Sequence, residues 1–203
     1  MTRTTDAPGT ADIIAALRGY PTTIIGDSQD RFGLPVGLKS MWDSEPFAGE
    51  AYTVLTAHGD NLGIHQALGQ IRPGQVLVVD GGGYDGRALI GDLVTEKARA
   101  LQVAALVIDG AIRDVVELAD LGVPVYARSV IPAGPWKNGP FRLQRPVVVG
   151  NVVVNPGDII VGDSDGLAVV NPDRAAEVLA TCEERVAREE ESRRRSRELT
   201  PNA

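Results

Sequence analysis

Apolar residues along this chain occur in two patterns, short continuous runs and helical spacings, and the two patterns alternate. Short runs typical of buried strands lie at Ala51–Leu55, Gln75–Asp80, Val103–Ile108 and Pro124–Ala127. Helical spacing is found at Ala11–Arg18 and Asn61–Gln70, in the stretch that begins at Gly91-Asp92, and at Asp114–Leu121. This alternation predicts β-α-β units with right-handed crossovers.

The last third of the chain has a different pattern, with more strands and one long helix. Three prolines and two glycines make Ile131–Pro140 a predicted loop. Strands are predicted at Pro146–Val154, Asp158–Val161 and Leu167–Val170, separated by tight turns at residues 155–157 and 162–166. The pair Asn171-Pro172 predicts the start of a long helix whose apolar stripe ends at Val186.

These elements predict an α/β fold in a single domain over residues 1–203, with a central β-rich layered core, flanking helices and a long C-terminal helix. The 203 residues, 43% of them hydrophobic, suffice for one core and are few for two. We expect residues 10–185 to form that core and residues 186–203 to form a charged tail. Glu189–Glu191 each lie four residues before Arg193–Arg195, so the tail is either a solvated segment or a contact with a neighbouring subunit.

The overall charge and composition restrict the partners and the compartment. A net charge of −7 and a pI near 4.9 disfavour nucleic acid and anionic membrane surfaces, because both repel an acidic protein at long range. Cys182 is the only cysteine, so no internal disulfide can form. Residues 1–20 lack a basic segment followed by a signal core, and no run approaches the ~20 apolar residues of a membrane span. We therefore expect a soluble, cytoplasmic protein.

The residue inventory also limits the metals that the chain could bind. Only two histidines, His58 and His65, accompany the single cysteine, so a site built from imidazole and thiolate ligands is nearly excluded. A bound metal would take most of its ligands from carboxylates and water. Such hard oxygen ligands favour magnesium or manganese.

The most informative spacing is Asp92, then twenty residues, then the pair Arg113-Asp114. The first N–H groups of a helix lack partners within the helix, so a helix start at Gly91-Asp92-Leu93-Val94 could bind a carboxylate. Arg113 could clamp the same carboxylate, while Asp114 and Asp92 could hold a cation. Spacing alone also permits a simpler interpretation, in which Asp92 is a helix N-cap and Arg113-Asp114 is a surface ion pair.

A glycine-rich segment, Gly81–Gly91, is predicted to be a loop and contains a possible phosphate-binding motif. Residues 81–86 match the G-x-G-x-x-G pattern after a strand. Residues 87–91 separate that pattern from the next helix start, and no acidic residue follows Gly86 at twenty positions. A loop bordering some other ligand pocket is therefore favoured over a nucleotide site.

Several motifs together resemble one family. The helix start at residues 91–94 and the segment Val107–Asp114 resemble the 4-hydroxy-4-methyl-2-oxoglutarate aldolase family, which includes proteins named as regulators of ribonuclease activity. Further similar landmarks, which extend the resemblance over residues 10–185, are Asp60-Asn61-Leu62, Pro73–Asp80, Gly122–Val125, Val154–Asp158 and Gly162–Gly166. The spacing Asp-x20-Arg-Asp is the most specific of them.

The resemblance implies a swivelling β/β/α-like fold and a divalent-metal-dependent aldolase that forms pyruvate, with oxaloacetate decarboxylation at the same site. It implies that Arg113 binds the pyruvyl carboxylate, that Asp114 coordinates Mg²⁺ or Mn²⁺ directly, and that Asp92 contacts the metal through water. Backbone amides of Leu93 and Val94 would complete the carboxylate site, which Gly91 leaves open to close approach. Many relatives carry Glu where this chain has Asp92.

The resemblance also implies a homotrimer or homohexamer with sites near subunit interfaces, and a small 2-keto acid as substrate. Family members can contribute an acidic residue from the C-terminal region of a neighbouring subunit, for which Glu189–Glu191 are candidates here. The resemblance leaves the physiological substrate and the general acid or base unassigned.

Other residues offer alternative mechanisms and roles. Lys137 could form a Schiff base with pyruvate, but that chemistry needs a desolvated amine and Lys137 lies in a predicted exposed loop. It could instead contact the departing carboxylate. His65 is more typical of a packed or interfacial histidine than of a base, Asp163 and Asp165 of a hairpin turn, and Cys182 of a small buried residue. The alternative function is a non-catalytic oligomeric regulator that binds an RNA-degrading enzyme or helicase.

Overall fold

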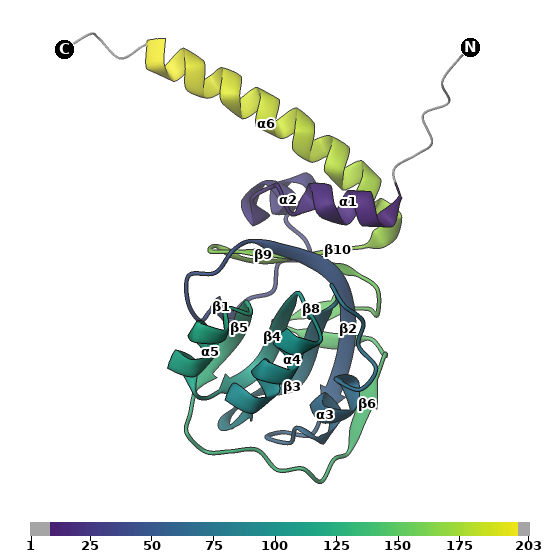
Figure 1. Cartoon of the computed structure of the whole chain (residues 1–203). Coiled ribbons are helices and arrows are strands. Elements are labelled where there is room, and N and C mark those ends of the chain that lie inside the picture. Colours follow the sequence, from purple (N-terminus) through teal and green to yellow (C-terminus); the bar gives the residue numbers. More distant parts are fainter. Residues whose placement is uncertain (1–8, 199–203) are drawn as a thin grey trace, which may run out of the picture.

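The computed structural model describes residues 9–198, which form one mixed α/β domain with a large central sheet (Figure 1). The helices are α1 Thr10–Leu17, α2 Thr22–Ser28, α3 Leu62–Ala67, α4 Asp92–Ala100, α5 Val115–Leu121, the 3-10 turn η1 Pro172–Arg174 and α6 Ala175–Glu198. The strands are β1 Lys39–Ser40, β2 Phe47–Thr56, β3 Val76–Ile90, β4 Ala105–Ile112, β5 Val125–Val130, β6 Phe141–Leu143, β7 Val147–Val149, β8 Val152–Val154, β9 Ile159–Asp163 and β10 Gly166–Val170.

The main sheet has the order β1-β5-β4-β3-β2-β9-β10, and β6 pairs with β2 beside this path. The four central strands β2, β3, β4 and β5 are parallel to one another, whereas β1, β9 and β10 pair antiparallel with their neighbours. Helices α3, α4 and α5 connect these parallel strands and lie over one face of the sheet (Figure 1). The predicted β-α-β units are therefore present.

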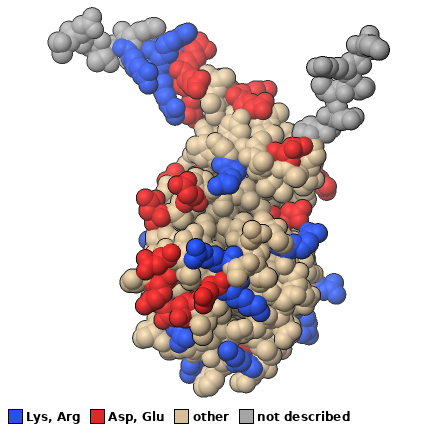
Figure 2. Space-filling model, viewed as in Figure 1, with Lys and Arg blue, Asp and Glu red and all other residues tan. Residues whose placement is uncertain are grey.

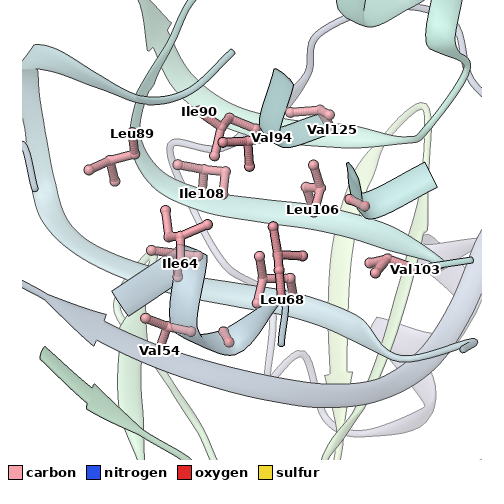
Figure 3. Packing of buried hydrophobic residues seen from close by; sticks show 14 of the residues in the cluster. Val54, Ile64, Leu68, Leu89, Ile90, Val94, Val103, Leu106, Ile108 and Val125 are labelled. Carbon is pink, nitrogen blue, oxygen red and sulfur yellow. The ribbon is translucent and has the colours of Figure 1, made fainter. Parts of the chain in front are cut away.

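The central strands are buried on both faces, which explains their unbroken apolar runs. Ile64 of α3, Leu68 just after it and Val94 of α4 belong to the helix-side core (Figure 3). Leu77 and Leu106 join the same core. Their neighbours on the strands, such as Val76 and Ala105, point to the opposite face and pack against β7, β8 and β9. Because side chains on a strand alternate between faces, every residue of such a strand must be apolar or partnered.

A third core joins the N- and C-terminal helices to the edge of the sheet. Ile13 of α1, Ile25 of α2 and Val178 of α6 pack with β9 and β10, and Cys182 is buried among them. Beyond this contact α6 extends away from the body, with acidic and then basic side chains toward its end (Figure 2). The predicted tail is thus helical as far as residue 198, and residues 199–203 lie outside the described part. No described helix has the length and apolar character needed to cross a membrane.

Two segments differ from the sequence-based expectation. The predicted loop Gly81–Gly91 is mostly strand, because Gly82 and Gly83 take positive φ values of 68° and 65° and form bulges that keep β3 paired with β4. The predicted single strand Pro146–Val154 is instead the hairpin β7–β8. Its turn is Gly150-Asn151, where both residues have positive φ, as a two-residue hairpin turn requires.

Smaller differences concern element limits. Helix α3 ends at Ala67, three residues before the predicted end at Gln70, and α2 and β1 were not anticipated. The helix α2 contains the β-branched run Thr22–Ile25, which local propensity assigns to a strand. Packing of Ile24 and Ile25 into the third core makes it helical instead.

Candidate functional site

The candidate site lies where two neighbouring parallel strands end. Ile90, the last residue of β3, pairs with Ile112, the last residue of β4, and the Arg113 N–H donates to the Ile90 carbonyl at 3.1 Å. The residues that follow, Gly91-Asp92 and Arg113-Asp114, therefore leave the sheet side by side. Helix α4 and strand β4, with the turn between them, account for the twenty residues between Asp92 and Arg113, so the spacing is a direct consequence of the β-α-β connection.

The two halves of the motif are in direct contact. The backbone N–H of Asp92 donates to Oδ2 of Asp114 at 3.2 Å, and Nε of Arg113 lies 3.3 Å from the same oxygen. Gly91 makes this approach possible. A methyl group at that position would lie 3.0 Å from Nε of Arg113 and would overlap Oδ2 of Asp114.

Asp114 has an unusual backbone conformation. Its φ of 58° and ψ of 44° lie in the left-handed region, which Asp tolerates better than most residues but which still carries some strain. Although Asp114 stands at the N-cap position of α5, its carboxylate makes no capping bond to that helix. It faces the start of α4 instead, and its geometry fits a role other than capping.

The simpler interpretation of the motif is only partly realised. The N-cap of α4 is Gly91, so Asp92 is the first helical residue and not the cap. Oδ1 of Asp92 accepts a hydrogen bond of 2.7 Å from the Leu93 N–H, one of the amides that we predicted to bind a carboxylate. The Arg113-Asp114 ion pair does exist and is partly exposed.

These residues line a cavity of about 260 Å³. It brings together the predicted residues Gly91, Asp92, Leu93, Val94 and Arg113. Lys137, which was a candidate contact for the departing carboxylate, also lines it. The other lining residues were not assigned to the site from sequence: Asn61, His65, Leu89, Ile90, Gly134 and Pro135. Asp114 contacts the edge of this group through the Asp92 amide.

Two of the added residues carry buried polar atoms without a hydrogen-bond partner, Oδ1 of Asn61 and Nε2 of His65. The amide group of Asn61 is held by its other end, since Nδ2 donates to the Leu89 carbonyl at 3.0 Å. Burial, with the positive charges of Lys137 and Lys97, lowers the pKa of His65 below its usual value. The sequence signal for both residues was the segment Asp60-Asn61-Leu62 and its helix, which we had interpreted as structural.

The loop that carries Lys137 is fixed by a buried carboxylate. Asp60, 2% exposed, accepts backbone N–H groups of Asn138 at 2.5 Å and Gly139 at 3.0 Å, and its other oxygen accepts the Leu62 N–H at 2.9 Å. Asp60 thus ties the loop to the start of α3, which places Lys137 and His65 on one cavity.

A cation–π contact holds the same loop from its other side. Arg87 lies 3.9 Å above the ring centroid of Trp136 and donates to the Gly134 carbonyl at 2.7 Å. The loop is therefore an ordered wall of the cavity.

The donor set suits a hard divalent cation that keeps much of its water. Within residues 9–198 no group of three or more His, Cys, Asp and Glu side chains could hold a metal ion. Asp92 and Asp114 offer two carboxylates at the strand ends. Mg²⁺ is often bound by one or two carboxylates, with water and substrate as its other ligands, so this pair fits such an ion.

Known proteins resemble this chain in sequence and in fold. A sequence model of the family described as "RraA-like: Aldolase/RraA" matches residues 10–169. The chain belongs to the aldolase/RraA family. A member from Halalkalibacterium halodurans, named "Putative 4-hydroxy-4-methyl-2-oxoglutarate aldolase", is 36% identical over 186 residues, which cover 91% of this chain and 88% of that protein. The family resemblance seen in the sequence is confirmed.

Solved structures from the aldolase/RraA family have the same fold. Streptomyces coelicolor RraAS2, described as an unusual member of the RNase ES inhibitor RraA family, gives a TM-score of 0.84 at 25% identity over 93% of this chain and 98% of that one. RraA from Thermus thermophilis, described as an RNA-processing inhibitor, gives a TM-score of 0.68 at 32% identity. The match covers 74% of this chain and 92% of that one. Relatives are thus named both for aldol cleavage and for inhibition of RNA processing.

The remaining candidates lie elsewhere. Glu189 and Glu191 pair with Arg193 and Arg195 on the extended part of α6, across the molecule from the loop of Lys137 (Figure 1). Asp163 is used in the β9–β10 turn, where Oδ1 accepts the Asp165 N–H at 3.0 Å, as predicted. The G-x-G-x-x-G segment lies inside β3 and does not open a helix, which argues against a phosphate cradle.

Proposed function

We propose that this member of the aldolase/RraA family is a divalent-metal-dependent carbon–carbon lyase. It cleaves 4-hydroxy-2-keto acids, such as 4-hydroxy-4-methyl-2-oxoglutarate, to pyruvate, and decarboxylates oxaloacetate. The observation that carries the proposal is the meeting of Arg113, Asp92 and the start of α4 at one small cavity, with Asp114 bonded to its edge. Relatives named as aldolases support it.

The positive groups of the site bind the anionic substrate, and the carboxylates bind the cation. The N-terminus of α4 and the Arg113 guanidinium attract the anionic pyruvyl end of the substrate. Asp92 and Asp114 would hold Mg²⁺ or Mn²⁺ next to it. When bound, such an ion supplies positive charge beside the 2-keto oxygen, where negative charge develops as the bond between C3 and C4 breaks. Both reactions form pyruvate enolate, and they differ in whether a keto acid or carbon dioxide leaves.

Lys137 suits the distal end of the substrate better than it suits imine formation. It lines the cavity but remains exposed, so its amine is not desolvated as Schiff-base chemistry requires. An ammonium group at the cavity wall can instead pair with the second carboxylate of a dicarboxylic keto acid.

Exposed apolar residues beside the site suit a subunit interface. Leu93 and Val116, in the first turns of α4 and α5, are 72% and 73% exposed in the isolated chain. We propose a homotrimer or homohexamer in which a neighbouring subunit covers this rim.

Activity assays with metal removal test the proposed function. Purified protein should release pyruvate from both substrates, lose this activity with a chelator and regain it with Mg²⁺ or Mn²⁺. Arg113→Lys and Asp114→Asn should each lower kcat/KM about 10²-fold or more. Arg113→Lys keeps the positive charge but loses the guanidinium geometry, and Asp114→Asn loses the negative charge. Arg142→Lys, a change at an exposed position of strand β6, is the matched control and should retain activity.

Three results would contradict the assignment. Full activity in both Arg113→Lys and Asp114→Asn would place the chemistry elsewhere. Trapping of pyruvate on Lys137 by borohydride would replace the metal mechanism with an imine. Absence of pyruvate release from every 4-hydroxy-2-keto acid and from oxaloacetate would favour a regulator of RNA-degrading enzymes, the role for which other family members are named.

A further inference from the structure

His65 is the one titratable residue lining the cavity whose chemistry the proposed mechanism does not use. Its helix α3 lies against the sheet, and the side chain lines the same cavity as Asp92 and Arg113. Nε2 is buried and has no hydrogen-bond partner. A buried nitrogen without a partner destabilises a fold, and such atoms are rare in native structures.

The distribution of such atoms points to a ligand. Among the described residues, five buried side-chain atoms lack a partner, and two of the five, on Asn61 and His65, line this same cavity. Oδ1 of Asn61 can only accept a hydrogen bond, and Nε2 of His65 can accept one when the ring proton is on Nδ1. Each of them can accept the hydrogen of a hydroxyl group on a ligand.

The surroundings keep the imidazole neutral. Burial, and then the positive charges of Lys137 on the loop and Lys97 on α4, lower the pKa of His65. Asp92 and Arg113 also line the cavity, and Asp114 pairs with Arg113 at its edge. A neutral imidazole can accept a proton. Once charged among these cations, it also gives that proton up readily.

We propose that His65 is the general base that takes the proton of the substrate 4-hydroxyl during aldol cleavage. This inference rests on the proposed function and adds the missing acid–base group to it. The O–H bond breaks as its proton moves to Nε2, and the O–H electron pair forms the new carbonyl at C4. The electrons of the bond between C3 and C4 pass into the enolate. The proton then returns from Nε2 to C3, which yields pyruvate and leaves His65 neutral.

Oxaloacetate decarboxylation does not need this base. The departing group is already a carboxylate, and the electrons of the bond that breaks pass into the same enolate, which solvent can protonate. A general base contributes about 10²–10⁴-fold to a reaction that needs one. Loss of His65 should therefore separate the two activities, whereas damage to the shared pyruvate site should lower both.

The experiment measures both reactions on the same preparations of full-length wild type, His65→Gln and His58→Gln, each with saturating Mg²⁺. His58 is the matched control, because it is the only other histidine, is exposed and stacks on Tyr84 outside this cavity. We expect His65→Gln to lower kcat for aldol cleavage about 10²-fold or more and to keep oxaloacetate decarboxylation within about 3-fold. His58→Gln should retain both.

A second variant separates chemistry from shape. In His65→Ala, added imidazole should restore aldol cleavage in proportion to its concentration and leave decarboxylation unchanged. Equal loss of both reactions in His65→Gln, unchanged aldol cleavage, or no rescue by imidazole in a folded His65→Ala protein would each overturn the assignment. Absence of both activities in the wild type would refute the proposed function, and the role of His65 with it.

Discussion

Replacing Gly91 with alanine tests the geometry of the site by the addition of a single methyl group. Gly91 has φ of −151° and ψ of −161°, an extended conformation that alanine adopts without strain, so the perturbation is steric. The new methyl would lie 3.0 Å from Nε and 3.1 Å from Cγ of Arg113, and would overlap Oδ2 of Asp114. Ordinary contacts lie near 3.5–4.0 Å, so Arg113 must move by roughly 0.5–1 Å and Asp114 by more than about 1 Å.

A displacement of this size at a reacting centre costs on the order of 10²-fold in rate. Overpacking should also destabilise the protein by about 1–3 kcal/mol, which thermal unfolding can measure. The assay is pyruvate release from oxaloacetate and from 4-hydroxy-4-methyl-2-oxoglutarate with added Mg²⁺. Both reactions should fall together, because they share Arg113 and Asp114.

Gly69→Ala is the matched control for this substitution. Gly69 is exposed beyond the end of α3, and a methyl there would meet only the Gln66 carbonyl at 3.4 Å. Its activity should stay within about 2-fold of wild type, since substitutions on an open surface change little. If Gly91→Ala were as active as this control, contact between the start of α4 and the Arg113-Asp114 pair would be irrelevant to catalysis.

Two further carboxylates are predicted to act through the fold. Asp60→Asn should cost about 1.5–3 kcal/mol of stability and raise KM. The reason is that an amide cannot accept all of the N–H hydrogen bonds that now fix the Lys137 loop. Unchanged thermal stability would contradict this. Burial raises the pKa of Asp158 above its usual 3.8, so this residue stabilises the fold at low pH and that contribution is lost as pH rises through the raised pKa. Asp158→Asn should therefore gain stability relative to wild type as pH increases from 3.8 upward. A difference in melting temperature between the two proteins that stays constant with pH would contradict this prediction.

Much of the site could be predicted from sequence because its main residues lie within one β-α-β unit. Asp92, Arg113 and Asp114 belong to connections that directly follow β3 and β4, and parallel neighbours bring such connections together. The apolar runs of these strands predicted their burial, and the glycine before Asp92 marked the helix start. The prediction was wrong at Gly81–Gly91, where the glycines suggest a loop although bulges keep β3 paired with β4.

The remaining part of the cavity could not be derived from local pattern. His65 and Lys137 are more than seventy positions apart, and their segments are joined by the Asp60 hydrogen bonds and by backbone hydrogen bonds of Trp136 to Gly59 and Asn61. A histidine on a helix is ambiguous in sequence, because burial and the absence of a partner are properties of its surroundings. Its unpartnered nitrogen therefore became visible only in three dimensions.

By itself, the sequence determined the family, the order of strands and helices in the core, and the charged motif at two strand ends. Local periodicity and spacing encode these features directly. Tertiary structure decided which side chains share the cavity, which of them lack partners, and that Asp92 stands one residue inside its helix. These properties depend on packing between distant segments, and no single stretch of the chain carries that information.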